Sequence, residues 1–165
     1  MEIERKWLMD TSSLPFSLAD CDREEIMQEY ISFSPTIRIR KLTYISADGA
    51  VHDPEYILTV KGKSLTGLSR EEYELSLSSD DYDRLSLKKE GRTIAKTRYL
   101  KNIDGYKYEM DVFSGDLSGL SYLEIEFPSE EEALNYPAPS WAYREVTGVR
   151  GFSNADLAKK GMPSL

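Results

Sequence analysis

Hydrophobic and polar residues alternate with a period of two along most of the chain, which is typical of β-strands with one buried face. Clusters of Gly, Ser, Asn and Asp separate the alternating segments and favour turns. Because short turns join most of these segments, we expect neighbouring strands to pair antiparallel. The pattern predicts strands over Glu2–Leu8, Thr36–Tyr44, Tyr56–Gly62, Ser69–Leu77, Thr93–Leu100, Tyr106–Phe113 and Tyr122–Phe127.

A few shorter segments favour helices. The sequence DREEIMQEYIS begins with acidic residues, as a helix N-terminus prefers, and SEEEAL contains the spacing of a capping box. We therefore expect a mainly β (α+β) fold in which a few helices cover an antiparallel sheet. Helices are expected over Asp22–Ser32, Ser79–Glu90 and Ser153–Lys160, with another that begins at the capping box of Ser129 and Glu132.

The composition is that of a globular, charge-rich protein. The 165 residues are 40% hydrophobic and 30% charged, with a net charge of −8, so we expect a single domain over residues 1–165. The acidic balance argues against nonspecific binding to nucleic acid or to a membrane surface. No signal peptide or membrane-spanning apolar run is visible, which predicts a cytoplasmic protein. With Cys21 and His52 as the only cysteine and histidine, a zinc site is nearly excluded.

The polar faces of the predicted strands carry ionic residues in phase, with few of the neutral polar residues that usually dilute a wetted face. The signs are grouped by strand, so that IRIRK carries two arginines and YLEIEF two glutamates. The cations in this set are Lys6, Arg38, Arg40, Lys61, Lys96 and Arg98. The carboxylates are Glu2, Glu4, Glu72, Glu74, Glu109, Asp111, Glu124 and Glu126.

Two interpretations of these charged faces remain open on periodicity alone. An antiparallel sheet commonly has one solvated face, where charges in phase are ordinary. Alternatively, the sheet closes into a barrel of about eight strands, which encloses room for one small ligand. A charged lumen must stay wet or hold a ligand that neutralises both signs, because unpaired buried ions are costly. A metal–polyphosphate complex meets this need, and carboxylates without histidine or cysteine favour Mg²⁺ or Mn²⁺.

The ordered series of motifs resembles the CYTH superfamily, also called triphosphate tunnel metalloenzymes, and in particular its short stand-alone bacterial type. The hallmark Glu-x-Glu-x-Lys strand is matched by EIERK, and the closing stretch REVTGVRGFSNADLA is similar to the C-terminal segment of the family. The resemblance implies a closed antiparallel β-barrel that forms a tunnel for triphosphate and divalent metal. One departure lies at Val149, where many relatives carry an acid, and it puts the details of the C-terminal lid in doubt.

The resemblance implies metal-dependent hydrolysis of a triphosphate, with inorganic triphosphate favoured (a tripolyphosphatase). The six cations would hold the phosphates, and Glu2, Glu4, Glu124 and Glu126 would bind Mg²⁺ or Mn²⁺. Glu72, Glu74, Glu109 and Asp111 would form a supporting acidic shell, and Lys61 with Tyr30 would transfer protons. The alternatives are a class IV-type adenylyl cyclase, a thiamine or nucleoside triphosphatase, and a non-catalytic polyphosphate-binding module. Exposed apolar outer strands would permit a homodimer.

Overall fold

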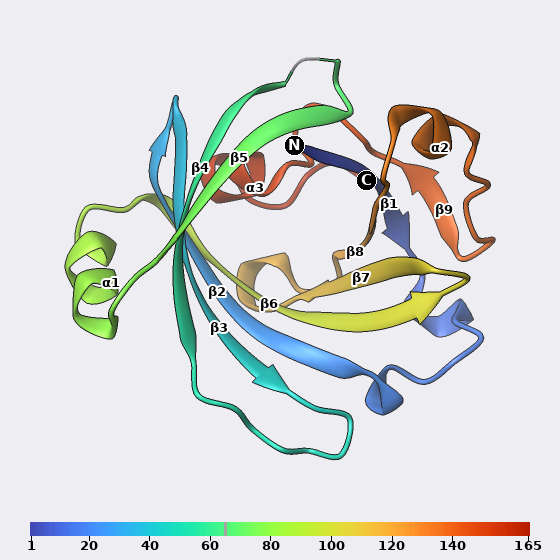
Figure 1. Ribbon diagram of the computed structural model, residues 1–165, viewed down its shortest axis with the longest axis horizontal. Helices are drawn as coiled ribbons and strands as arrows, with labels where there is room; N and C mark the ends of the chain where they lie inside the picture. Colours follow the sequence, from blue (N-terminus) through green and yellow to red (C-terminus); the bar gives the residue numbers. More distant parts are fainter. Residues whose placement is uncertain (65) are drawn as a thin grey trace.

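The computed structural model describes residues 1–64 and 66–165, and its strands form one nine-stranded antiparallel sheet in the order β5-β4-β3-β2-β6-β7-β8-β1-β9 (Figure 1). A further pairing of β5 with β1 closes eight of these strands into a barrel, and β9 extends it beside β1. The closed antiparallel barrel expected from the sequence is confirmed. The strands are β1 (Glu2–Met9), β2 (Asp22–Phe33), β3 (Thr36–Ile45), β4 (Glu55–Ser64), β5 (Ser69–Ser76), β6 (Glu90–Ile103), β7 (Tyr106–Phe113), β8 (Ser121–Glu126) and β9 (Ala142–Glu145).

Strand β1 forms the seam of the barrel. Its start pairs with β5, where Glu2 lies opposite Arg70, and its end pairs with β9, where Trp7 lies opposite Glu145. Its other edge pairs with β8, with Lys6 opposite Glu124. Because side chains alternate along a strand, this arrangement turns the EIERK carboxylates and lysine to one face of the barrel wall.

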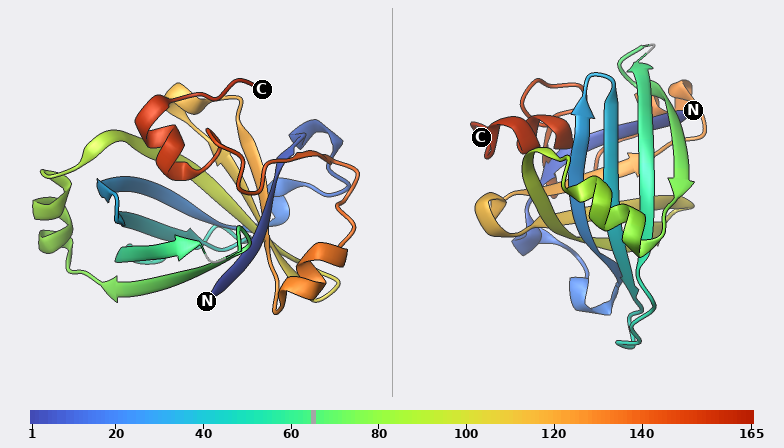
Figure 2. Two further views of the ribbon diagram at one scale, coloured as in Figure 1. Left: turned by 90° about the horizontal axis from the view of Figure 1, so that it is seen from above. Right: turned by 90° about the vertical axis from the view of Figure 1, so that its left-hand side faces the viewer.

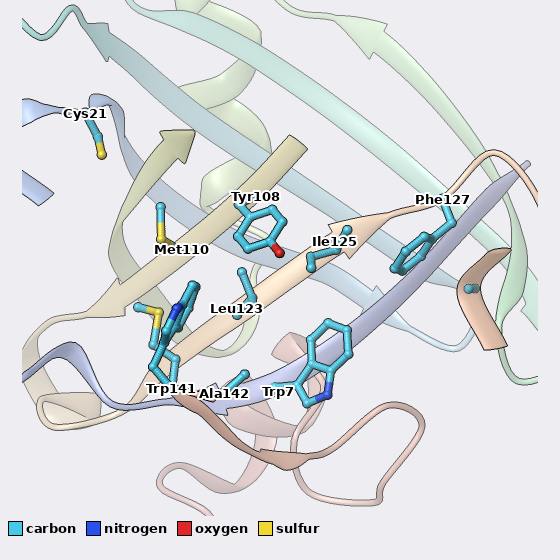
Figure 3. Close-up of a cluster of buried hydrophobic side chains, with 11 residues drawn as sticks. Trp7, Cys21, Tyr108, Met110, Leu123, Ile125, Phe127, Trp141 and Ala142 are labelled. Atoms are coloured by element: carbon cyan, nitrogen blue, oxygen red, sulfur yellow. The ribbon is translucent and has the colours of Figure 1, made fainter. Parts of the chain in front are cut away.

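The opposite face of the same strands carries a hydrophobic cluster on the outside of the barrel. Figure 3 shows Trp7, Leu123 and Ile125 on adjacent strands, with Trp141, just before β9, and Ala142, its first residue, packed against them. Helix α2 (Glu130–Asn135) adds the buried Ala133 to this cluster. A substantial part of the core therefore lies between the barrel wall and its covering segments, which leaves the interior free for polar residues. The short 3₁₀ turns are Thr11–Ser13, Leu18–Asp20 and Gly115–Leu117.

A second hydrophobic cluster lies at one end of the barrel, beneath helix α3 (Asn154–Lys160). It includes Phe113 and Tyr122, which are in phase with the charged Asp111 and Glu124 on the same strands. Leu157 of α3 is fully buried against this cluster. The view from above in Figure 2 shows the C-terminal segment running across this end of the barrel.

Helix α1 (Ser79–Ser86) packs on the outer face of the barrel across β2 and β3, as the right-hand view of Figure 2 shows. Glu29 of β2 accepts hydrogen bonds from Tyr82 Oη at 3.2 Å and from Ser86 Oγ at 2.8 Å. These bonds tie the helix to the strand through a buried carboxylate.

The helix expected over Asp22–Ser32 is wrong, because this segment is strand β2. The acidic start resembles a helix N-terminus, but Ile26, Gln28 and Tyr30 share one buried face at a spacing of two. The polar Gln28 interrupts the hydrophobic alternation because this face looks into a polar interior. The sequence also missed the short strand β9.

The remaining helix predictions are confirmed, with small shifts in their ends. The helix predicted over Ser79–Glu90 already ends at Ser86. Ser129 caps α2 by accepting a hydrogen bond from the backbone N–H of Glu132, and Ser153 caps α3. In the described part of the chain, no helix combines the length and the apolar character that crossing a membrane requires.

Candidate functional site

A cavity of about 540 Å³ lies inside the barrel, and ionic side chains of both signs from β1, β3, β4, β5, β6, β7 and β8 line it. All six predicted phosphate-binding cations reach this cavity, together with most of the predicted carboxylates. From the sequence-predicted set, the lining residues are Lys6, Arg38, Arg40, Lys61, Lys96, Arg98, Tyr30, Glu2, Glu4, Glu72, Glu74, Glu109 and Glu124. The charged rows therefore converge on one cavity instead of spreading over the outer surface.

Two predicted carboxylates are absent from the described lining of this cavity. Asp111 is fully buried behind it, where it pairs with Lys96 and Arg98. Glu126 is exposed and lies opposite Glu4 at the end of the same acidic row. These two carboxylates therefore lie in different surroundings from the carboxylates that line the cavity.

The cavity also contains residues that the sequence analysis did not assign to the site. Arg70 and Arg150 both line it, as do Asn154 at the start of α3 and residues of the segment that precedes this helix. Arg70 could have been found, because it is in phase with Glu72 and Glu74 on β5. Arg150 lies in an irregular segment after β9, where no periodicity points to the cavity.

In four cation–carboxylate pairs of the cavity wall, the two side chains come from different strands. Their closest N–O distances are longer than the 2.7–2.9 Å of tight charge-assisted hydrogen bonds. Within each loose pair, the two charges neutralise one another in part, while N–H donors and carboxylate oxygens remain directed at the cavity. The pairs are Lys6–Glu124 at 3.4 Å, Arg38–Glu72 at 3.6 Å, Arg40–Glu74 at 3.3 Å and Lys61–Glu2 at 3.7 Å.

Like charges are crowded in two parts of the cavity. Burial, followed by the neighbouring carboxylates of Glu124 and Glu2, raises the pKa of Glu4 to about 8. Burial, followed by the guanidinium groups of Arg38 and Arg98, lowers the pKa of Arg40 to about 10. A cation placed among the carboxylates and an anion placed among the arginines would each relieve this repulsion.

A buried ion network supports the cationic wall. Asp111 lies 2.7 Å from Lys96 Nζ and accepts two hydrogen bonds from Arg98, at 2.7 and 2.9 Å. Although burial alone would raise the pKa of Asp111, Arg98 and then Lys96 hold it well below the ordinary value. Lys96 Nζ also donates to Asn154 Oδ1 at 3.1 Å, which ties the start of α3 to the wall. Asp111 thus fixes the positions of two cations without reaching the cavity itself.

The carboxylates of the cavity suit a hard divalent cation in chemical type. Glu2, Glu4 and Glu124 offer carboxylate oxygens to the cavity, and the pKa of Glu4 is raised first by burial and then by the charges of Glu124 and Glu2. In residues 1–64 and 66–165, no three histidine, cysteine or carboxylate side chains already stand in a group that could hold a metal. The donor set fits Mg²⁺ or Mn²⁺ by its chemistry, and its side chains would have to draw together around the ion.

Comparison with known proteins identifies the family. No family model matches the chain. An inorganic triphosphatase from Nitrosomonas europaea is 35% identical to it over 162 residues, which cover 95% of this chain and 96% of the relative. The chain belongs to the inorganic triphosphatase family.

Two further comparisons agree with this membership in the triphosphatase family. An inorganic triphosphatase from Acetivibrio thermocellus is 40% identical over 103 residues, which cover 62% of this chain and 64% of the relative. A crystal structure of an inorganic triphosphatase superposes with a TM-score of 0.64 at 32% identity, covering 96% of this chain and 94% of its own. The barrel described above is therefore the fold of a solved family member.

Proposed function

We propose that this chain hydrolyses inorganic triphosphate in its barrel cavity with the help of a divalent metal, as a short member of the CYTH superfamily. One observation carries the proposal: cations and carboxylates from seven barrel strands line a single cavity. The named triphosphatase relatives support it, since one of them aligns with 95% of the chain. Hydrolysis of a phosphoanhydride depends on positioning and charge stabilisation, which a cavity lined by charges of both signs can supply.

The cationic side chains would bind the phosphate groups. Arginine offers a planar fork of donors that matches phosphate oxygens, and lysine offers a compact charge. Arg38 and Arg40 are each less than one-tenth exposed, so they would act on the substrate with little screening by water. The proposed phosphate ligands are Lys6, Arg38, Arg40, Lys61, Lys96 and Arg98.

Glu2, Glu4 and Glu124 would hold the metal at the acidic side of the cavity. Mg²⁺ or Mn²⁺ bound there would neutralise part of the phosphate charge and make water a better nucleophile. The role of Glu126 as a fourth ligand stays a prediction, because this side chain is exposed at the end of the row. Glu72, Glu74 and Glu109 would orient the cations, and Asp111 would do so from behind the cavity wall.

Lys61, together with Tyr30, would move protons during the reaction. Burial, followed by the charge of Arg38, lowers the pKa of Lys61, a shift in the direction that suits general acid–base work. Both side chains line the cavity.

Replacing Lys61 with alanine is expected to lower kcat by about 100-fold, in the range of general acid–base catalysis, while KM rises by a smaller factor because the side chain is also a proposed phosphate ligand. Steady-state phosphate release measures both constants. Lys41→Ala, which removes a lysine from the outer face of β3, is the matched control and should behave as wild type. A Lys61→Ala variant that changes only KM would exclude Lys61 from proton transfer.

A substrate panel tests the proposed function. Tripolyphosphate, ATP, GTP and thiamine triphosphate are incubated with the protein and either Mg²⁺ or Mn²⁺, and phosphate release and cyclic nucleotides are measured. We expect tripolyphosphate to be converted fastest, to orthophosphate and pyrophosphate, with no turnover in EDTA. A cyclic nucleotide product would overturn the hydrolase proposal, and tight binding without phosphate release would indicate a non-catalytic module.

The compartment and the oligomeric state stay predictions. We propose a cytoplasmic protein, and a homodimer would be built from exposed outer side chains such as Tyr73 and Leu75 of β5.

A further inference from the structure

Four buried polar atoms have no hydrogen-bond partner within the described chain, and they come from adjacent strands. They are Gln28 Oε1 on β2, the Nε atoms of Arg38 and Arg40 on β3, and Thr59 Oγ1 on β4. In the strand register, Gln28 lies opposite Arg40 and Thr59 lies opposite Arg38. Buried polar groups are almost always paired, so such a concentration in a cavity wall marks a place under functional constraint.

Gln28 joins this group of atoms to Tyr30. The two side chains lie on the same face of β2, and Gln28 Nε2 donates a hydrogen bond to Tyr30 Oη at 2.9 Å. The phenolic oxygen is therefore an acceptor in this bond, and in residues 1–64 and 66–165 the Tyr30 hydroxyl donates no hydrogen bond to another group. Because Tyr30 lines the cavity, its O–H is left to point toward a ligand there.

Gln28 itself does not reach the cavity. Its exposed fraction is 0%, and it is not among the described lining residues. Any effect of this amide on a bound phosphate must therefore pass through Tyr30 or through the neighbouring guanidinium groups.

We propose that Gln28 is a positioning residue for the reaction, which orients the Tyr30 hydroxyl as a hydrogen-bond donor to the substrate. The inference rests on the proposed triphosphatase function and deepens it. Glutamine suits this role because its amide nitrogen can only donate. A carboxylate at the same position would accept the phenolic proton and turn it away from the cavity.

Gln28→Glu tests the direction of this bond, because the substitution keeps the shape of the side chain and replaces the donor with an acceptor. We expect kcat for tripolyphosphate to fall by about 10- to 100-fold, with KM within about 3-fold of wild type. Gln28→Leu, which removes the donor without adding an acceptor, should lower kcat less than Gln28→Glu does. Thermal unfolding of each variant shows whether it is folded at the assay temperature.

Tyr30→Phe completes the test, because it removes the hydroxyl on which Gln28 is proposed to act. In the Tyr30→Phe background, Gln28→Glu should lower kcat by less than about 2-fold further. An equal loss in both backgrounds, or a change confined to KM, would overturn the positioning role. If the wild-type protein releases no phosphate from tripolyphosphate, the proposed function fails instead, and the two failures are therefore distinguishable.

Discussion

Replacing Glu4 with glutamine is expected to lower tripolyphosphate turnover by about 100- to 1,000-fold, the size of effect seen when one electrostatic contact of a transition state is removed. The substitution should leave the fold intact. Since the pKa of Glu4 is raised to about 8, a neutral side chain of the same shape already suits the ligand-free cavity at neutral pH. Glutamine cannot supply the negative charge with which Glu4 is proposed to bind the metal, so the metal concentration needed for half-maximal activity should also rise.

Glu25→Gln provides the control for this prediction. Glu25 is exposed on the outer face of β2, where it accepts a hydrogen bond from Thr97, and it has no part in the cavity. Phosphate release, measured as a function of Mg²⁺ concentration, should match wild type for Glu25→Gln. A Glu4→Gln variant with normal turnover and normal metal dependence would remove Glu4 from the metal site.

Replacing Asp111 with asparagine is expected to destabilise the protein by about 3–5 kcal/mol, because it leaves two buried cations without their shared counter-charge. Lys96 and Arg98 both pair with this carboxylate, at 2.7 Å in each case. For a protein of this size, a loss of this kind lowers the melting temperature by roughly 10 °C. Chemical denaturation and thermal unfolding measure the two quantities, with Asp83→Asn on the exposed face of α1 as the control.

Because of the buried carboxylate of Asp111, we also expect the stability of the protein to depend on pH. The pKa of Asp111 is lower in the folded protein than in the unfolded chain, so its contribution is present above pH ~4 and is lost as the pH falls below that value. The free energy of unfolding of wild type should therefore drop more steeply than that of Asp111→Asn in acid. Parallel pH profiles for the two proteins would show that Asp111 is not the source of this stability.

The fold was largely predictable from the sequence because its strands alternate clearly. The Tyr106–Phe113 strand was predicted with its observed ends, since apolar residues alternate with charged ones and the NIDG turn precedes it. Strand β2 was not, because its inward face mixes Ile26, Gln28 and Tyr30 and its acidic start imitates a helix. Hydrophobic alternation alone therefore does not reveal every strand of a barrel that has a polar interior.

Site residues could be predicted where charged residues alternate along a strand, but not where they lie in an irregular segment. Counting residues assigns Lys6, Arg38 and Glu124 each to the charged face of its own strand. Only the closure of the barrel brings these three faces together around one cavity. Arg150 reaches the cavity from an irregular segment, and no local pattern indicates its direction. The sequence also does not indicate how deeply a residue is buried. Asp111 and Glu109 lie on the same face of β7, but only Glu109 lines the cavity.

Calorimetric titration of tripolyphosphate into the protein in EDTA tests most directly whether the charged rows form one internal binding site. We expect one molecule to bind per chain, with at least about 10-fold weaker binding for Arg38→Ala, because a hydrogen bond to a charged group is lost. Arg23→Ala, on the outer face of β2, should bind within about 2-fold of wild type. Equal weakening by the two substitutions, or several molecules bound per chain, would contradict the account.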